Sequence, residues 1–171
     1  MKRIKLTQNQ YALVDDGDYA ELNQWKWQAH YNPHTKSYYA VRTTLAKNGK
    51  RKQIGMHRII LNAPKNMQVD HINHNTLDNR KQNLRLCTQS QNQMNQARHK
   101  KTLSKYKGVD LAEWKYKNKV YQYWRARIQI NGKPILLGLF KSEIQAARGY
   151  DKAAKELFGE FAFINFKEEI K

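Results

Sequence analysis

The sequence predicts an α+β protein built from small antiparallel sheets and a few helices. Asn48-Gly49 and Asn131-Gly132 each separate two strand-like runs. Asn-Gly is favoured in two-residue hairpin turns because both turn positions require a positive φ. Ser142 followed by Gln145 forms a capping box ahead of a segment with helical apolar spacing. Strand and helix signals therefore occur in one chain, and the strand signals are grouped in hairpins.

Residues 1–56 are expected to form a β-rich region. The pattern predicts a hairpin whose strands run from Ser37 to Ala46 and from Arg51 to Met56. Asp18 is followed three residues later by Glu21, which predicts one short helix from Tyr19 to Gln24.

Residues 57–97 form a second segment that is rich in Asn, Gln and His. A short helix is predicted from His57 to Leu61 and a short strand from Met67 to His71. A second strand from Leu84 to Cys87 follows a polar loop, and the helix from Gln89 to Arg98 begins at a capping box. Together with residues 1–56, this segment is predicted to form one domain, residues 1–97.

Residues 98–105, RHKKTLSK, contain four Lys or Arg and no acidic residue, and we interpret them as an inter-domain linker. A solvated surface run of charge is the alternative. Residues 106–171 then form the second domain, in which strands precede a helix that begins at Ser142 and ends at Gly159. The apolar stripe of this helix is expected to pack on the sheet and comprises Ala147, Tyr150, Ala154, Leu157 and Phe158.

The composition indicates a polyanionic partner. The chain of 171 residues carries a formal net charge of +18, from 32 Lys and Arg against 14 Asp and Glu. Such an excess favours nucleic acid, because bound cations release condensed counterions.

The single cysteine, Cys87, excludes an internal disulfide and a multi-cysteine zinc site. No apolar run approaches the roughly 20 residues that span a bilayer, and Met1 to Gln10 lacks a signal-peptide core. A cytoplasmic protein of a bacterial or phage-infected cell is expected, with no membrane partner.

Residues 68–92 contain side chains suited to phosphodiester cleavage. This reaction requires a base that deprotonates water and a metal ion that neutralises developing charge. Asp70 and His71 are adjacent at a predicted strand end and should point to opposite faces. Oxygen ligands from Asp70 and Asn92 would suit magnesium, and Asn83 could fix the tautomer of His71. The spacing alone leaves an ordinary polar loop equally open.

The motifs MHRIIL (56–61), VDHIN (69–73), NLR (83–85) and TQSQN (88–92) as a set resemble the HNH motif of phage- and intron-type homing endonucleases. The resemblance implies a β-β-α-metal nuclease unit that binds one divalent metal, Mg²⁺ with Mn²⁺ as the alternative. It further implies that His71 is the general base, Asp70 and Asn92 are the metal ligands, and Asn83 orients His71.

Four further residues of this region have separate expected roles. His74 stands where many relatives have glycine, so the turn is expected to differ or His74 to contact DNA. His57 is expected to be a structural hydrogen-bonding residue. Arg80 and Arg85 are expected to contact phosphates, with a solvated surface role as the alternative.

The strand before Asn131 has two distinct faces. Arg125, Arg127 and Gln129 alternate with apolar residues and should form an exposed face that could lie in the major groove. An ordinary solvated strand face is the alternative at this point. The apolar face comprises Trp124, Ala126, Ile128 and Ile130.

The motifs YKGV (106–109), YWRARI (123–128), LLGLF (136–140), EIQAARGYDKAA (143–154) and INF (164–166) together resemble a plant ethylene-response-factor (Apetala-type) DNA-binding domain. The resemblance implies a three-stranded antiparallel sheet packed on one helix. It also implies that Lys107, Arg125, Arg127 and Gln129 face DNA. Asp110 and Leu136 depart from the plant pattern, so the recognised DNA sequence should not carry over.

The combined interpretation is a site-directed, homing-type DNA endonuclease that uses one divalent metal and a His general base on double-stranded DNA. A non-catalytic, sequence-specific DNA-binding regulator is the first alternative, and an RNA- or ribosome-binding protein is the second. The sequence indicates no obligate protein partner and leaves monomer and dimer open.

Overall fold

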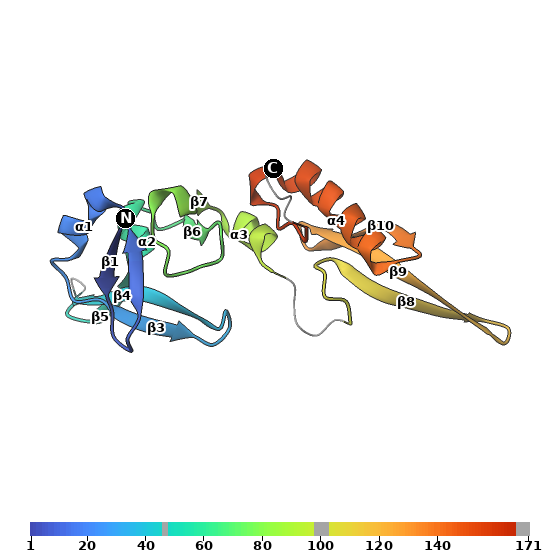
Figure 1. Ribbon diagram of the computed structural model, residues 1–171, viewed down its shortest axis with the longest axis horizontal. Helices are drawn as coiled ribbons and strands as arrows, with labels where there is room; N and C mark the ends of the chain where they lie inside the picture. The colour runs from blue at the N-terminus through green and yellow to red at the C-terminus, as the bar shows by residue number, and fades with distance from the viewer. Residues whose placement is uncertain (46–47, 98–102, 167–171) are drawn as a thin grey trace. The chain divides into compact units, whose positions relative to one another are not determined.

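The computed structural model describes residues 1–45, 48–97 and 103–166, which form mostly strands in several small sheets with interspersed helices (Figure 1). The chain divides into two compact units, Met1–Gln89 and Ser90–Lys171. The division falls earlier than the expected boundary at residue 97, so helix α3 (Gln89–Asn95), apart from its first residue, groups with the C-terminal unit. Part of the expected linker, residues 98–102, lies outside the described residues.

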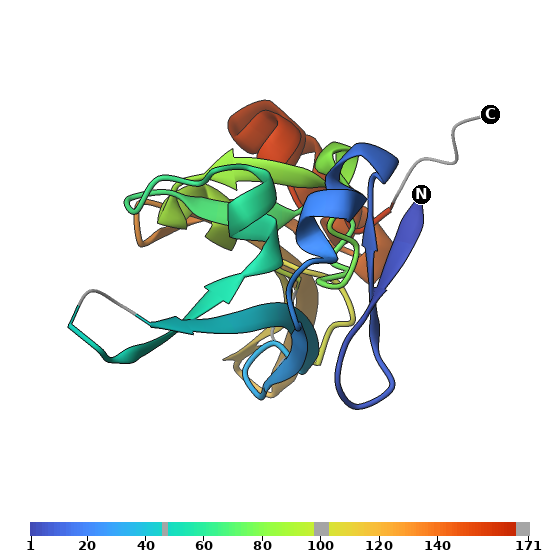
Figure 2. The same cartoon turned by 90° about the vertical axis from the view of Figure 1, so that its left-hand side faces the viewer.

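The N-terminal unit begins with a hairpin and a short helix (Figure 2). Strands β1 (Lys2–Lys5) and β2 (Tyr11–Val14) pair antiparallel, and α1 (Asp16–Leu22) follows. The expected helix bounds, Tyr19 to Gln24, are wrong. The helix begins three residues earlier because Asp15, rather than Asp18, occupies the extended N-cap position. Asp16 and Asp18 then lie in the first turn, where carboxylates interact favourably with the helix dipole.

A three-stranded antiparallel sheet supports this hairpin. Its strands are β3 (Gln28–Asn32), β4 (Ser37–Leu45) and β5 (Arg51–Gly55), in spatial order β3-β4-β5. The register pairs Leu45 with Arg51 and Val41 with Gly55, which confirms the predicted hairpin. Residues 46–47 of the predicted first strand and turn lie outside the described residues.

The apolar core of the N-terminal unit lies between these two sheets and α1. Each large aliphatic side chain removed from water contributes about 1.5–3 kcal/mol, so this cluster is the main stabilising element of the unit. Its buried members are Ile4, Leu6, Ala12, Val14, Leu22, Trp27, Ala29, Ala40 and Met56.

A second hairpin follows the short helix α2 (Met56–Ile60). Strands β6 (Gln68–His71) and β7 (Leu84–Cys87) pair antiparallel, with Asp70 opposite Arg85 and His71 opposite Leu84. A one-turn 3-10 helix, η1 (Lys81–Asn83), leads into β7, whose last residue is the buried, free Cys87.

The loop between β6 and β7 is bonded to strand β2. The Leu13 N–H donates to the Leu77 carbonyl at 2.8 Å, and the Asn79 N–H donates to the Leu13 carbonyl at 2.8 Å. The long polar loop therefore extends the β1-β2 hairpin by one isolated bridge, between Leu13 and Asp78.

The C-terminal unit contains a three-stranded antiparallel sheet in the order β10-β9-β8. The strands are β8 (Val109–Tyr116), β9 (Lys119–Ile130) and β10 (Lys133–Phe140), and helix α4 (Glu143–Phe158) packs against all three. The order of elements is the one implied by the resemblance. A short 3-10 helix, η2 (Gly159–Phe161), follows α4.

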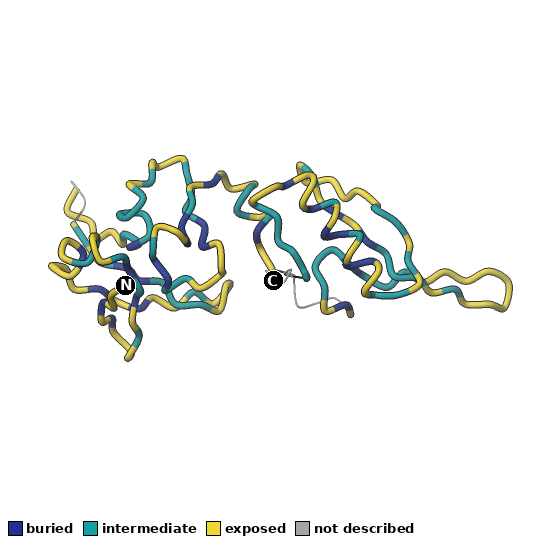
Figure 3. Tube along the Cα trace, turned by 45° about the horizontal axis from the view of Figure 1, so that its top comes forward, coloured by how far each residue is buried: buried dark blue, intermediate teal, exposed yellow. Residues whose placement is uncertain are grey.

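Helix α4 begins and ends as predicted. The Ser142 hydroxyl accepts the Gln145 N–H at 3.2 Å, and Gly159 ends the helix with a φ of 53°. Along α4, buried and exposed residues alternate (Figure 3). Leu157 is 51% exposed, so its assignment to the buried stripe is wrong. The buried residues of the helix are Ala146, Ala147, Tyr150, Asp151, Ala154 and Phe158.

The β8-β9 hairpin is longer than the rest of the sheet. Strand β10 pairs with β9 only from Trp124 to Ile130, whereas β8 pairs with β9 as far as Tyr116 and Lys119. The outer part is thus a two-stranded ribbon that extends past α4 (Figure 1).

Gly108 provides a test of the packing between the sheet and α4. Its φ is +75°, and an added Cβ would lie 2.0 Å from Tyr150 Cδ2 and 2.7 Å from the Arg127 carbonyl oxygen. We predict that Gly108→Ala lowers the free energy of unfolding of this unit by about 2–4 kcal/mol, from left-handed strain and overpacking. Gly132→Ala is the matched control, because Gly132 has φ +78° and no heavy atom within 4 Å of the added Cβ. Denaturation followed by tryptophan fluorescence should show a much smaller loss for the control, and equal losses would contradict the packing argument.

Candidate active site

His71 lies at the end of β6 within a cluster of three rings. Its ring centroid is 5.3 Å from that of His57 and 6.3 Å from that of Tyr39, with edge-on interplanar angles of 74° and 70°. His71 is buried, and so is its neighbour Asp70. Because consecutive strand residues point to opposite faces, these adjacent side chains meet different surroundings.

The Nε2 atom of His71 is buried and has no hydrogen-bond partner among the described residues. Burial lowers the pKa of His71, while the neighbouring Asn79 amide and the Asp70 and Asp78 carboxylates act in the opposite direction. The net effect favours a neutral imidazole, which can accept a proton. Buried polar atoms without partners are rare in proteins, so this nitrogen calls for a functional explanation.

Asp70 forms a cross-strand ion pair with Arg85. Oδ2 of Asp70 accepts Nη2 of Arg85 at 2.7 Å and Nε at 2.9 Å, and the two side chains are only 7% and 11% exposed. This differs from the phosphate contact expected of Arg85, since its guanidinium is mostly buried against a carboxylate. The register that places residue 70 opposite residue 85 brings the pair together.

Asn83 is bonded to the backbone of the loop. Its Oδ1 accepts the Asn73 N–H at 2.9 Å, and its Nδ2 donates to the Asp78 carbonyl at 2.8 Å. The amide that lies beside His71 belongs to Asn79. This position of Asn79 could not be predicted, because nothing in its local pattern distinguishes it from other loop residues.

Asp78 and Arg80 form a bidentate ion pair inside the loop. Nε and Nη2 of Arg80 each lie 2.7 Å from one oxygen of Asp78, which is 2% exposed. Asn73 Nδ2 also donates to Asp78 at 3.0 Å. The Arg80 side chain therefore lowers the pKa of Asp78 and fixes the loop, rather than presenting a free cation for the expected phosphate contact.

The turn at His74 keeps a left-handed backbone. Its φ is +63°, the conformation that glycine would adopt with less strain. The neighbouring Asn73 Oδ1 accepts the Asn75 N–H at 2.8 Å, as in an Asx turn. The replacement of glycine by His74 thus leaves a left-handed turn in place.

The donor chemistry of Asp70 fits a divalent metal ion. A carboxylate oxygen is a preferred ligand for hard cations, and this one already attracts a positive group, the Arg85 guanidinium. Over the described part of the chain, no group of three or more His, Cys, Asp and Glu side chains is gathered as a metal site. Asn92, the second expected ligand, is an amide on α3 and belongs to the C-terminal unit.

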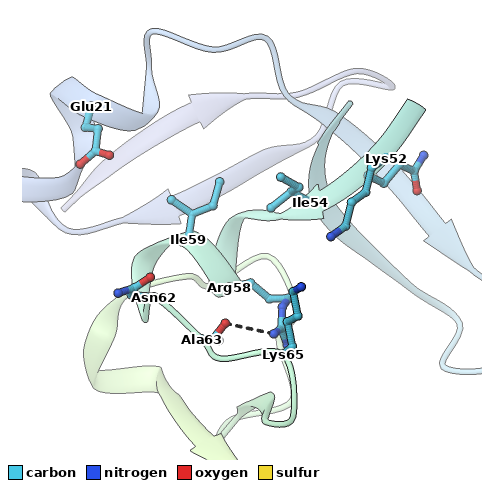
Figure 4. A pocket seen from close by; sticks show the side chains of 9 residues that line it. Glu21, Lys52, Ile54, Arg58, Ile59, Asn62, Ala63 and Lys65 are labelled. Carbon is cyan, nitrogen blue, oxygen red and sulfur yellow. Dashed lines mark hydrogen bonds between the residues drawn. The ribbon is translucent and has the colours of Figure 1, made fainter. Parts of the chain in front are cut away.

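A separate hollow in the N-terminal unit contains none of the predicted site residues (Figure 4). It lies between β5, α2 and the chain that follows, and it has Lys52 and Lys65 at its edge. Arg58 in this hollow donates to the carbonyls of Met67 and Pro64 at 2.8 Å, so its guanidinium group fixes the loop between α2 and β6.

In the C-terminal unit, Asp110 lies between the two predicted DNA-contacting arginines. Its carboxylate is 2.6 Å from Nη2 of Arg125 and 3.2 Å from Nη2 of Arg127. The arginine side chains remain 35% and 44% exposed, and Gln129 on the same strand face is also exposed. The three polar residues therefore share an open face, and one acidic residue partly neutralises it.

Lys107 has different surroundings from those expected of a DNA contact. Its Nζ donates to the carbonyls of Met94 and Gln96, each at 2.6 Å, and burial lowers its pKa to about 8. These carbonyls lie at the C-terminal end of α3, where a cation interacts favourably with the helix dipole. Lys107 therefore caps α3, a partner that sequence spacing does not reveal.

Beside the arginines, three aromatic side chains are stacked on the β8-β9 ribbon. The Trp114 ring lies 5.0 Å from Tyr123 at an interplanar angle of 6°, and 5.9 Å from Tyr121 at 15°. Trp114 is 42% exposed. The open sheet face thus combines cationic and aromatic side chains.

Comparisons with known proteins identify the class of protein that this hairpin and its buried histidine define. Residues 62–94, which span the β6-β7 hairpin, match the HNH endonuclease family model. An uncharacterised HNH endonuclease of Acanthamoeba polyphaga mimivirus is 36% identical over an alignment of 162 residues, which covers 91% of this chain and 74% of that protein. No solved structure matches the chain significantly. The chain belongs to the HNH endonuclease family and is a hydrolase that cleaves DNA.

The family assignment decides between the functions that the sequence left open. It supports an enzyme over a non-catalytic regulator, and it implies a DNA substrate and a divalent metal ion. None of the helices in the described ranges has the length and apolar character that a membrane crossing requires.

The Asp70–Arg85 pair can be tested by its effect on stability. Arg85→Met should lower the free energy of unfolding by about 3 kcal/mol, because it leaves a buried carboxylate without its cation. Arg51→Met, which removes an exposed arginine from β5, should change stability by less than about 0.5 kcal/mol. Urea denaturation of both variants is the measurement. An unchanged free energy of unfolding in Arg85→Met would show that the ion pair contributes nothing to stability.

Proposed function

We propose that the protein is a site-directed, homing-type endonuclease in which His71 is the general base. The observation that carries this proposal is the buried Nε2 of His71, which has no partner in the described structure and is attached to an imidazole favoured in its neutral form. A neutral imidazole in this state is ready to accept a proton from the attacking water.

The residues around His71 fix its position. Asn83 and Asp78 hold the loop through backbone and side-chain hydrogen bonds, and this loop carries Asn79 beside the imidazole. Asn83 would thus orient His71 through the loop.

Asp70 would hold the divalent ion, together with Asn92, the second ligand that the HNH motif assigns. When bound, the ion supplies positive charge that stabilises the phosphate and the leaving 3′ oxygen. We propose Mg²⁺ as the ion, with Mn²⁺ as a substitute, since both ligands are hard oxygen donors.

The C-terminal sheet is proposed to grip double-stranded DNA in the manner of an ethylene-response-factor domain. Arg125, Arg127 and Gln129 lie on the open face opposite α4, where arginine can reach guanine edges and glutamine adenine edges. The net charge of +18 supports a further, sequence-independent attraction to phosphates.

Removal of the imidazole tests the catalytic proposal. His71→Ala should reduce the rate of Mg²⁺-dependent cleavage of duplex DNA by about 10²–10⁴-fold, the usual contribution of a general base. DNA affinity measured without metal should persist, because the sheet face is unchanged. His34→Ala, at an exposed histidine, is the control and should cut at the parent rate. A His71→Ala protein that cuts as fast as the parent would end the proposed mechanism.

Neutralisation of Asp110 on the sheet face tests the proposed DNA-binding surface. Asp110→Asn should bind non-specific duplex DNA more tightly and with a steeper salt dependence, because two arginines lose their internal counterion. Glu113→Gln makes the same change of charge on the same strand, but Glu113 accepts from Gln122 and, among the described residues, forms no ion pair with either arginine. Fluorescence anisotropy at several salt concentrations would separate the two, and identical curves would argue against this face as the DNA-binding surface.

A further inference from the structure

We propose that His57 is a positioning residue for DNA cleavage, which holds the imidazole of His71 edge-on from the neighbouring helix α2. This inference rests on the proposed role of His71 as the general base. His57 lies outside residues 62–94, the segment that matches the family model, and the family comparison assigns it no role.

The first support is the packing of the three rings. Each ring contacts the other two, and the shortest centroid distance is the 5.3 Å between His57 and His71, at an interplanar angle of 74°. The His57 ring is also 6.1 Å from Tyr39, at 65°. These residues come from three different elements, α2, β6 and β4. Edge-to-face contacts between rings restrict their rotation, so His57 limits the orientations that His71 can adopt.

The second support is the space that Gly55 leaves. A Cβ on Gly55 would lie 2.6 Å from Cε1 of His57 and 2.9 Å from its Nε2, closer than real contacts allow. Gly55 has a φ of −75°, which any residue adopts, so the backbone does not require glycine here. The absent side chain therefore serves to admit the His57 ring into the cluster.

The third support is that Nδ1 of His57 makes no structural hydrogen bond within the described residues. The sequence predicted a structural hydrogen-bonding residue, but Nδ1 of His57 is buried and unpartnered among the described residues. The pKa of His57 is lowered to about 3, mainly by burial and to a smaller extent by the nearby charges of His71 and Arg58. A purely structural position would be filled at lower cost by an apolar side chain, since a buried unpaired polar atom destabilises by about 1–3 kcal/mol.

The decisive experiment measures single-turnover cleavage and metal-free DNA affinity for His57→Ala and His57→Phe. If His57 positions His71, His57→Ala should lower the cleavage rate constant at least tenfold with an affinity within twofold of the parent. His57→Phe should recover most of the rate, because it retains a ring edge against His71. Parent-like cleavage by His57→Ala, or equal defects in both variants, would overturn the proposal.

Gly55→Ala provides an independent test that does not alter His57 itself. It should slow cleavage at least fivefold in the parent by displacing the His57 ring, yet have little further effect in the His57→Ala background. Gly17→Ala is the matched control, because nothing lies within 4 Å of an added Cβ there. Additive effects of Gly55→Ala and His57→Ala would contradict the coupling. If His57→Ala does not fold, the cleavage rate constants of Gly55→Ala and His57→Phe test the proposal: the first should be lowered at least fivefold and the second should stay close to the parent.

His71→Ala separates this inference from the function on which it rests. Should His71→Ala retain cleavage, the general-base assignment fails whatever His57 does. An inactive His71→Ala together with a fully active His57→Ala would reject only the positioning role. The imidazole ¹⁵N NMR signals of His71 supply a direct readout, and they should shift in His57→Ala and Gly55→Ala but not in Gly17→Ala.

Discussion

The candidate active site depends on a network of polar interactions around one short hairpin. Two-stranded hairpins of this length are marginal in water by themselves. The β6-β7 hairpin is held by the Asp78–Arg80 pair within its loop, by the Asp70–Arg85 pair across its strands, and by backbone bonds from the loop to β2. Because charge-assisted bonds are directional, this network fixes the loop beside His71 as well as stabilising it.

Elements with local sequence signals could be predicted from the sequence. The β6-β7 hairpin and helix α4 were predicted nearly to the residue, because their signals are local: alternation, a capping box and a terminal glycine. Leu157 was misassigned because it fits the helical spacing but lies at the edge of the stripe, where the sheet does not cover it. Helix α1 begins three residues before its predicted start, because several carboxylates near residue 15 are suited to the N-cap position and Asp15 occupies it.

The partners of charged side chains could not be predicted, because they depend on register and tertiary packing. Arg85 meets Asp70 only through the strand register, and Lys107 meets the carbonyls of α3 only after the chain has folded back. Both were expected to contact DNA, as their charge and position suggest when the sequence is considered alone. Tyr39 gave no signal at all, since its neighbours in the ring cluster lie in later elements.

Helix α3 is stabilised by contacts within the C-terminal unit. Met94 packs against the buried cluster of Ile128, Tyr150, Ala154 and Phe158, and Lys107 caps the helix end. The helix that carries Asn92, the second proposed metal ligand, is thus stabilised by the sheet-and-helix unit proposed to grip DNA. The division into two compact units therefore falls inside the segment that matches the HNH family model, and not at its end.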